Sequence, residues 1–245
     1  MDTPQRIAKI LSRAGVASRR HAEMLVIQGS VTVNGTAISD PATKVKSDDK
    51  IKVNGELVAA PQDRRLWRYN KPTGLVTTTL DEKGRRTIYD GLPSNLPRLM
   101  SIGRLDIASE GLLLLTNDGA LKRHFELPSV GFVRTYRVRA KGFHDEALLG
   151  SLRRGIIIDG ERFRPMAITL NKIQGSNVWY TVALREGRNR EIRRAFREIN
   201  MVVNRLIRIS FGAFELGSLG KGQIEEIPAK LFHGSLNLKE TDNKF

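Results

Sequence analysis

Apolar and polar positions follow two patterns along the chain, and the pattern changes about a quarter of the way through. In residues 6–14 apolar positions recur at helical spacing, and a second helix is predicted over 19–28 with Ser18 as its N-cap. Short strands with Asn-Gly turns are predicted at 31–33 and 51–53. The first part is therefore expected to be two helices followed by a small sheet.

A linker is predicted over residues 59–63, Ala-Ala-Pro-Gln-Asp. Beyond it, apolar alternation resumes and indicates many short strands. We therefore expect two folded units, residues 4–60 and 65–235, and a flexible polar tail over 236–245.

One carboxylate has an informative setting in the stretch GRLDIASEGLLLLTND, residues 103–118. The uninterrupted apolar run Leu112 to Leu115 predicts a strand that is buried on both faces. Asp106 precedes this strand, so it is expected in a short loop held by a rigid core element. Gly103 and Gly111 are expected to let the backbone form this loop and approach a ligand closely.

Composition narrows the functional classes. The chain has 245 residues, 40% of them hydrophobic, and no cysteine, which excludes a disulfide scaffold, thiol catalysis and Cys-ligated metal centres. Its apolar runs are far shorter than the ~18 residues of a membrane span, and the N-terminus lacks a signal-peptide core. A cytoplasmic protein with no membrane partner is expected.

The charge balance points to a polyanionic partner. Lys and Arg outnumber Asp and Glu by 41 to 26, a net charge of +15, and most of the excess lies beyond residue 60. Nucleic acid is favoured over a membrane surface, because no basic amphipathic helix of the membrane type is evident. The alternative is a basic but merely solvated surface.

The pattern RIAKILSRAGVASRRHAEMLVIQGSVTVNG resembles the S-four-type RNA-binding module over residues 4 to about 58. Four basic residues are expected to lie around the junction of its two helices and to meet phosphates of a folded RNA. They are Lys9, Arg13, Arg19 and Arg20. The alternative is a solvated helix surface.

The densest basic segment is REGRNREIRRAFREINMVVNRLIRI, residues 185–209. A helix is predicted over 190–199, with Ile192, Ala195, Phe196 and Ile199 on its apolar face. Its arginines cannot all share one face at 3.6 residues per turn. Arg190, Arg194 and Arg197 are expected to point outward as phosphate contacts. Arg193, beside the apolar face, is a candidate for pairing with a carboxylate, although a basic helix without a catalytic part is an equal alternative.

Several motifs in order resemble the ribosomal RNA pseudouridine synthases of the RsuA/RluB type. KPTGLVTT, GRLDIASEGLLLLTNDG, RTYRV and EGRNREIRR follow the S-four-type module, and the segment WYTVALREGRNREIRRAF most resembles the RluB branch. Ser109 stands where the family more often has threonine, which keeps a small hydroxyl. The resemblance implies isomerisation of a specific uridine, in large-subunit ribosomal RNA, to pseudouridine.

The resemblance also implies roles for single residues. Asp106 matches the essential aspartate, which acts on the uridine as a nucleophile or as a base. Arg193 would form an ion pair with Asp106, and Tyr136 in RTYRV would stack on the uracil. Because the uridine is extruded from its stack, Arg104 would enter the vacated space, while Arg190 and Arg194 would bind substrate RNA.

The implied architecture is an α+β fold. It consists of a small RNA-binding domain of two helices plus strands, followed by a synthase domain with a mixed, largely antiparallel sheet. No cofactor is expected, and no metal, because the four histidines lack ligand spacing: His21, His124, His144 and His233. A monomer is the expected state.

Two other functional classes compete with this hypothesis. A non-catalytic RNA-binding factor in ribosome assembly explains the charge and the N-terminal module, but leaves the three predicted catalytic residues as coincidences. A nucleic-acid hydrolase of the metal-dependent kind needs clustered acids, and the adjacent pair Asp81-Glu82 reads as a loop beside a Lys-Gly turn.

Overall fold

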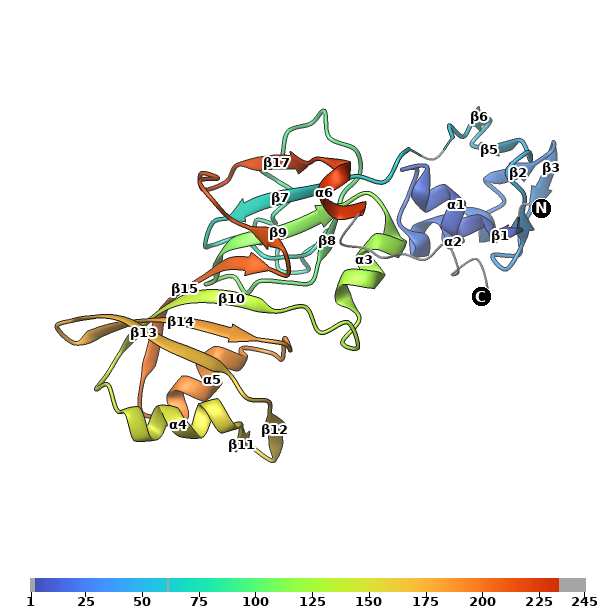
Figure 1. Cartoon of the computed structure of the whole chain (residues 1–245). Helices are drawn as coiled ribbons and strands as arrows, with labels where there is room; N and C mark the ends of the chain where they lie inside the picture. Colours follow the sequence, from blue (N-terminus) through green and yellow to red (C-terminus); the bar gives the residue numbers. More distant parts are fainter. Residues whose placement is uncertain (1–2, 61, 234–245) are drawn as a thin grey trace.

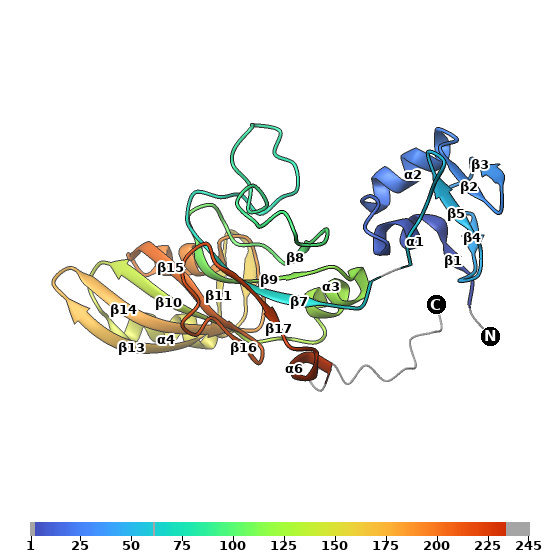
Figure 2. The same ribbon diagram turned by 90° about the horizontal axis from the view of Figure 1, so that it is seen from above.

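The computed structural model describes residues 3–60 and 62–233, which form two units beside one another (Figures 1 and 2). The N-terminal unit packs two helices against small sheets. Its elements are β1 (Gln5–Arg6), α1 (Ile7–Arg13), α2 (Arg19–Ile27), β2 (Val31–Val33), β3 (Thr36–Ile38), β4 (Lys44–Val45), β5 (Ile51–Val53) and β6 (Glu56–Leu57).

Local sequence signals explain why these helices begin and end where they do. The hydroxyl of Ser18 accepts a hydrogen bond from the backbone N–H of His21 at 3.1 Å, which caps α2. Gly15 and Gly29 follow the two helices with φ of +81° and +72°, values that favour glycine. The predicted helices and strands of this unit are confirmed.

The second unit contains a nine-stranded sheet of order β13-β14-β10-β15-β9-β7-β17, with β8 paired to β9 and β16 to β15. Its elements are β7 (Leu66–Lys71), β8 (Met100–Ile102), β9 (Glu110–Thr116), α3 (Gly119–Glu126), β10 (Arg134–Lys141), α4 (Glu146–Arg154), β11 (Ile156–Ile158), β12 (Glu161–Phe163), β13 (Ala167–Gln174), β14 (Asn177–Leu184), α5 (Glu191–Glu198), β15 (Val202–Phe211), β16 (Phe214–Glu215), β17 (Ile224–Ile227) and α6 (Ala229–His233).

The large sheet consists of two halves. The first contains β13, β14, β10, β15 and β16, and the second contains β9, β7, β17 and β8; they join at a seam between β15 and β9. Within the described residues its named strands pair antiparallel, except that β9 and β15 run parallel through only two residue pairs. At this seam Gly111 has φ of +101°, and a Cβ there would lie 2.3 Å from the carbonyl oxygen of Arg208. Gly111 is therefore needed for the approach of two strands, and the expected close approach to an RNA ligand stays a prediction.

Two hydrophobic cores lie on opposite faces of this sheet. One core gathers apolar residues from both halves of the sheet, including Tyr136 and Leu105. Helices α4 and α5 lie on this side of the sheet (Figure 1). The other core gathers residues of β7, β8, β9 and β17, with Phe211 and Phe214 from β15 and β16, and α3 and α6 pack against it. Because β9 contributes to both cores, every residue of this strand is buried, which confirms the prediction for Leu112 to Leu115.

The predicted fold class is confirmed: an α+β chain with a mixed, largely antiparallel sheet in its second unit. Residues 59–60 and 62–65, around the expected linker, carry no helix or strand. The expected tail, 236–245, lies outside the described residues. Across the ranges 3–60 and 62–233, the structure contains no helix long and apolar enough to cross a membrane.

Candidate active site

Asp106 lies in the loop that connects β8 to β9, as the sequence predicted. Its side chain is about one-third exposed, at 35%. Its backbone is held from within, since the carbonyl oxygen accepts hydrogen bonds from the N–H of Ser109 at 2.9 Å and from Nζ of Lys71 at 3.1 Å. The preceding Leu105 is buried in the larger core. The carboxylate of Asp106 is therefore accessible to solvent, while the backbone that carries it is fixed by hydrogen bonds.

The segment KPTGLVTT, residues 71–78, holds this loop along its length. Nζ of Lys71 also donates to the carbonyl of Ser109 at 3.0 Å, and the N–H of Gly74 donates to the carbonyl of Ile107 at 2.8 Å. The buried hydroxyl of Thr77 donates to the carbonyl of Leu105 at 2.8 Å. Side-chain and backbone donors of one segment therefore bind four backbone carbonyls of the Asp106 loop, between residues 105 and 109.

Lys71 is fully buried, at 0% exposure, at the end of strand β7. Burial lowers the pKa of its ammonium group to about 8, against the opposing influence of the Asp106 and Glu110 carboxylates. A buried ammonium is tolerated here because three backbone carbonyls accept its three hydrogens, the third belonging to Pro72 at 3.0 Å. Lys71 therefore links the strand to the Asp106 loop.

The arginine that pairs with Asp106 differs from the one expected. Nη1 of Arg190 lies 4.0 Å from Oδ2 of Asp106, whereas Arg193 donates from Nη1 to the carbonyl of Val203 at 2.7 Å and from Nη2 to the carbonyl of Ala108 at 3.1 Å. Burial lowers the pKa of Arg193, and the charge of Asp106 acts in the opposite direction. Arg193 is thus close to Asp106 but holds its loop through the backbone.

The start of α5 explains this exchange. The helix begins at Glu191, and Arg190 precedes it in the left-handed conformation with φ of +49°. The sequence periodicity predicts Arg190 inside the helix, where its side chain would point in the direction that helical geometry sets. In its left-handed conformation, Arg190 instead directs its own side chain toward Asp106.

The first turn of α5 places the carboxyl group of Glu191 beside that of Glu186, which lies in the loop before the helix. Glu191 is 4% exposed, and burial, followed by the neighbouring carboxyl group of Glu186, raises its pKa to about 8. One oxygen of Glu191 accepts a hydrogen bond from the backbone N–H of Arg188 at 3.0 Å. At neutral pH this side chain is therefore mostly protonated and can donate to Glu186.

The outward orientation expected for Arg194 is wrong. Its guanidinium group donates to Glu161 at 2.7 Å and lies 3.3 Å from Asp159, on the β11–β12 hairpin. The same group stacks over Phe163, 4.7 Å from the ring centroid. Because these partners belong to the protein itself, Arg194 fastens the hairpin to α5, and its role as an RNA contact stays a prediction.

Tyr136 and Arg104 occupy contrasting positions. Tyr136 lies on β10, opposite Val182 of β14 and Arg208 of β15, and is buried at 9% exposure on the α5 side of the sheet. Arg104 is exposed, two residues before Asp106 in the same loop. The site therefore offers an exposed arginine beside the carboxylate and an aromatic ring in the adjoining sheet.

Three of the N-terminal basic residues, Lys9, Arg13 and Arg19, lie near one another, and Lys9 and Arg13 lie near Asp118 at the start of α3. Burial lowers the pKa of Lys9, and the nearby charges of Arg13 and Arg19 lower it further. Nε of Arg13 lies 3.7 Å from Oδ2 of Asp118, the residue that caps α3. Arg20 is exposed on the first turn of α2. Arg13 is thus partly engaged by the second unit.

Two parts of the sequence match known families. Residues 65–198 match the family of RNA pseudouridylate synthases, and residues 5–51 match the S4 domain. The chain belongs to the RNA pseudouridylate synthase family. The family match contains Asp106, Tyr136 and all of α5, and the S4 match contains Lys9 and the other three residues of the N-terminal basic cluster.

Several relatives extend over most of the chain. An "uncharacterized RNA pseudouridine synthase" of Rickettsia felis is 49% identical, over 93% of this chain and 98% of that protein. The ribosomal large subunit pseudouridine synthase B of Pseudomonas aeruginosa is 39% identical, over 91% of this chain and 59% of that protein. A crystal structure of a pseudouridylate synthase superposes with a TM-score of 0.65 at 26% identity, covering 93% of this chain and 98% of the other.

Sequence reasoning misses several residues that build the candidate site around Asp106. The sequence motif KPTGLVTT assigns no role to Lys71 or Thr77, because the partners of both side chains are backbone carbonyls, which every residue has. A lysine that ends an otherwise buried strand was the available signal. Arg208 was also missed: it is 2% exposed and donates from Nε to the carbonyl of Leu112 at 2.6 Å, across the seam.

Metal ligation has no evident place in the described part of this synthase. Among residues 3–60 and 62–233, three or more His, Asp or Glu side chains do not come together in a way that could hold an ion. The pair Asp81-Glu82 lies in a loop, as expected, and Asp81 pairs with Arg85 at 2.7 Å.

Proposed function

We propose that this pseudouridine synthase isomerises one specific uridine of ribosomal RNA, in the large subunit. Support comes from the relatives whose names specify that subunit, the S4 match and the net charge of +15. In the reaction the N1–C1′ bond of uridine breaks and a C5–C1′ bond forms. The proton of C5 leaves to solvent and N1 gains one, so no oxidant or cofactor is required.

The observation that carries this proposal is the Asp106 loop. It presents a partly exposed carboxylate on a backbone tied to Lys71, Gly74, Thr77 and Arg193. A group that must act on a flipped nucleotide needs fixed geometry, because a misplacement of about 1 Å can cost ~100-fold in rate. Asp106 is proposed to act on the uridine, as a nucleophile or as a base.

The neighbouring residues receive separate roles. Arg104, exposed beside the carboxylate, is proposed to enter the space that the extruded uridine leaves. Tyr136 is proposed to stack on the uracil. Arg190 supplies positive charge 4.0 Å from Asp106, which offsets repulsion between the carboxylate and RNA phosphates. Arg193 is proposed as a positioning residue, since it contacts the loop backbone.

The test is Asp106→Asn, assayed by tritium release from ribosomal RNA labelled at uracil C5. The substitution keeps size and hydrogen-bonding capacity but removes the charge, so release should fall by ~1,000-fold or more. RNA affinity should stay similar or rise slightly, because one repulsion with phosphates disappears. Asp48→Asn, an exposed aspartate of the N-terminal unit, is the matched control and should retain full activity.

The products separate the competing functions. Release by Asp106→Asn near the wild-type rate in single turnover would refute the role of Asp106. RNA binding without tritium release by the wild type would favour the non-catalytic assembly factor. Free uracil or strand breaks among the products would favour a hydrolase.

We further propose that residues 59–63 link the RNA-binding domain, 4–60, to the synthase domain, 65–235, and that the two domains fold independently. Deleting residues 1–60 should leave the remainder folded by circular dichroism and weaken RNA binding by ~10-fold, through the loss of Lys9, Arg13, Arg19 and Arg20. Unchanged affinity would remove the module from RNA binding, and an unfolded fragment would refute the boundary. Monomeric state and cytoplasmic location stay predictions.

A further inference from the structure

The half of the large sheet formed by β13, β14, β10 and β15 has one face with no described helix against it (Figure 1). Both α4 and α5 lie on one side of these strands (Figure 1), and alternate residues such as Val138 and Val182 are buried there. The intervening residues point to the other side, and these four strands contain no Asp or Glu at all. We call this other side the open face.

The open face carries a tryptophan between arginines. Trp179 is half-buried on β14, and strand pairing places Arg139 and Lys172 opposite it on the two neighbouring strands. The guanidinium carbons of Arg137 and Arg139 lie 5.0 and 5.7 Å from the indole centroid. A partly exposed aromatic ring among cations on an open sheet is the arrangement on which single-stranded nucleotides stack, with phosphates held by the cations.

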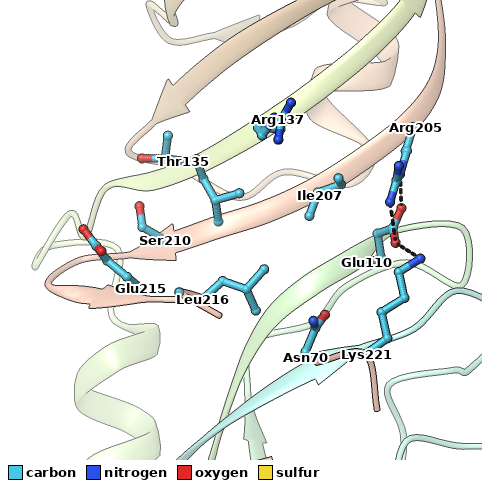
Figure 3. Close-up of a pocket in the computed structure, with 12 residues that line it drawn as sticks. Asn70, Glu110, Thr135, Arg137, Arg205, Ile207, Ser210, Glu215, Leu216 and Lys221 are labelled. Carbon is cyan, nitrogen blue, oxygen red and sulfur yellow. Dashed lines mark hydrogen bonds and ion pairs between the residues drawn. The ribbon is translucent and has the colours of Figure 1, made fainter. Parts of the chain in front are cut away.

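A pocket of about 620 Å³ continues this surface toward the seam (Figure 3). Arg137, Thr135 and Ile207 line it from the strands of the open face. Its buried carboxylate, Glu110, is neutralised by Arg205 at 2.6 Å and Lys221 at 2.8 Å, and the Arg205 hydrogen bond above all keeps the pKa of Glu110 below its ordinary value. The pocket therefore presents little net negative charge to an approaching polyanion.

The open face and Asp106 lie on opposite sides of the sheet. Arg193 and Lys71, which hold the Asp106 loop, belong to α5 and to the α5-facing positions of β7. Arg137 and Trp179 face away from α5, as the burial of their strand neighbours Tyr136, Val138 and Tyr180 shows. A ligand on the open face therefore lies on the side of the sheet away from the Asp106 loop.

We propose that the open face binds single-stranded nucleotides of the substrate RNA that flank the structure containing the target uridine. One base stacks on Trp179, while Arg137, Arg139 and Lys172 contact phosphates. The proposal rests on the proposed function in taking RNA as the substrate. A second copy of the chain is disfavoured on the same face, because four strands with only positive charges would repel their like.

Tryptophan fluorescence gives a direct test with the full chain. The protein has two tryptophans, and Trp67 is 2% exposed, so a change on stacking reports Trp179. Titration with an oligouridylate of about 12 nucleotides should quench the wild-type signal, and the quenching should be absent in Trp179→Phe. Equal quenching in both proteins, or none in the wild type, would overturn the proposal.

Affinity for the same oligouridylate tests the contacts separately. Trp179→Ala should weaken binding by about 5- to 150-fold, the effect of losing one stacked base. The double variant Arg137→Gln with Arg139→Gln should lower the slope of log affinity against log salt by about 1.4, or 0.7 per phosphate contact. Lys230→Gln, an exposed cation on α6, is the matched control and should change neither quantity by much.

The Asp106→Asn protein separates this proposal from the proposed function. The open-face proposal predicts full quenching in this protein, whatever the chemistry at Asp106. The proposed function separately predicts that it releases almost no tritium. Normal catalysis on ribosomal RNA with unchanged affinity in Trp179→Ala and in the double arginine variant would overturn the open-face site alone. Self-association that the double variant abolishes, without any effect on oligouridylate binding, would assign the face to a second copy and overturn it as well.

Discussion

The two faces of the large sheet use the same kinds of charged side chains differently. On the α5 face Lys71, Arg193 and Glu191 are buried or half-buried and bind backbone groups or one another. On the open face Arg137 and Arg139 lie over an indole at the protein surface. The difference teaches that a charge enclosed by protein fixes geometry, whereas a charge left at the surface is available to a ligand.

Among the buried charges of the α5 face, the largest expected effect comes from replacing Lys71 with methionine. Lys71→Met leaves the carbonyls of Pro72, Asp106 and Ser109 without their shared donor, at a cost of at least ~2 kcal/mol in the free energy of unfolding. Because the Asp106 loop loses an anchor, single-turnover tritium release should fall by ~100-fold. Thermal denaturation and the tritium assay measure the two effects.

A pH profile gives a second reading that needs no variant. As pH rises through about 8, Lys71 loses its proton, and the neutral amine has two hydrogens for three carbonyls. Wild-type activity should therefore decline above about pH 8. Lys230→Met is the matched control for the substitution. Full activity of Lys71→Met, with a wild-type profile flat from pH 7 to about 9, would show that the enclosed charge does not set the loop.

A smaller effect is expected from Glu191→Gln at the start of α5. The folded chain holds a proton on Glu191 up to about pH 8, whereas the unfolded chain releases it near the ordinary value of 4.5. Stability from this group is therefore present at low pH and is lost as pH rises between these values. Glutamine cannot ionise, so the Tm at pH 8 should rise by about 3–6 °C and depend less on pH.

The control for this change lies in the same helix. Glu198→Gln alters an exposed glutamate near the end of α5 and should leave the pH dependence of the Tm unchanged. A lower Tm of Glu191→Gln at pH 8 would contradict this prediction. It would show that the Glu191 carboxylate is ionised and paired with a cation in the folded chain.

The elements and the location of Asp106 could be predicted because their causes are local. The apolar run of β9, the Ser18 cap and the glycines after the first two helices all act within a few residues. The buried face of α5 followed from helical spacing in the same way, and Ile192, Ala195 and Phe196 are buried as predicted.

The partners within the site could not be predicted, because they depend on tertiary contacts and on one backbone angle. The left-handed conformation of Arg190 turns its side chain toward Asp106, and periodicity carries no signal for it. The links of Lys71 and Arg193 to the loop end on carbonyl oxygens, which every residue has. The pairing of Glu110 with Arg205 joins residues 95 positions apart.

The central claim is that the Asp106 loop converts a particular uridine of ribosomal RNA. The most direct measurement maps pseudouridine in ribosomal RNA from cells that lack this protein and from the same cells supplied with the wild type or with Asp106→Asn. We predict one large-subunit position that loses its modification, regains it with the wild type and fails to regain it with Asp106→Asn. An unchanged map without the protein, or full restoration by Asp106→Asn, would contradict the account.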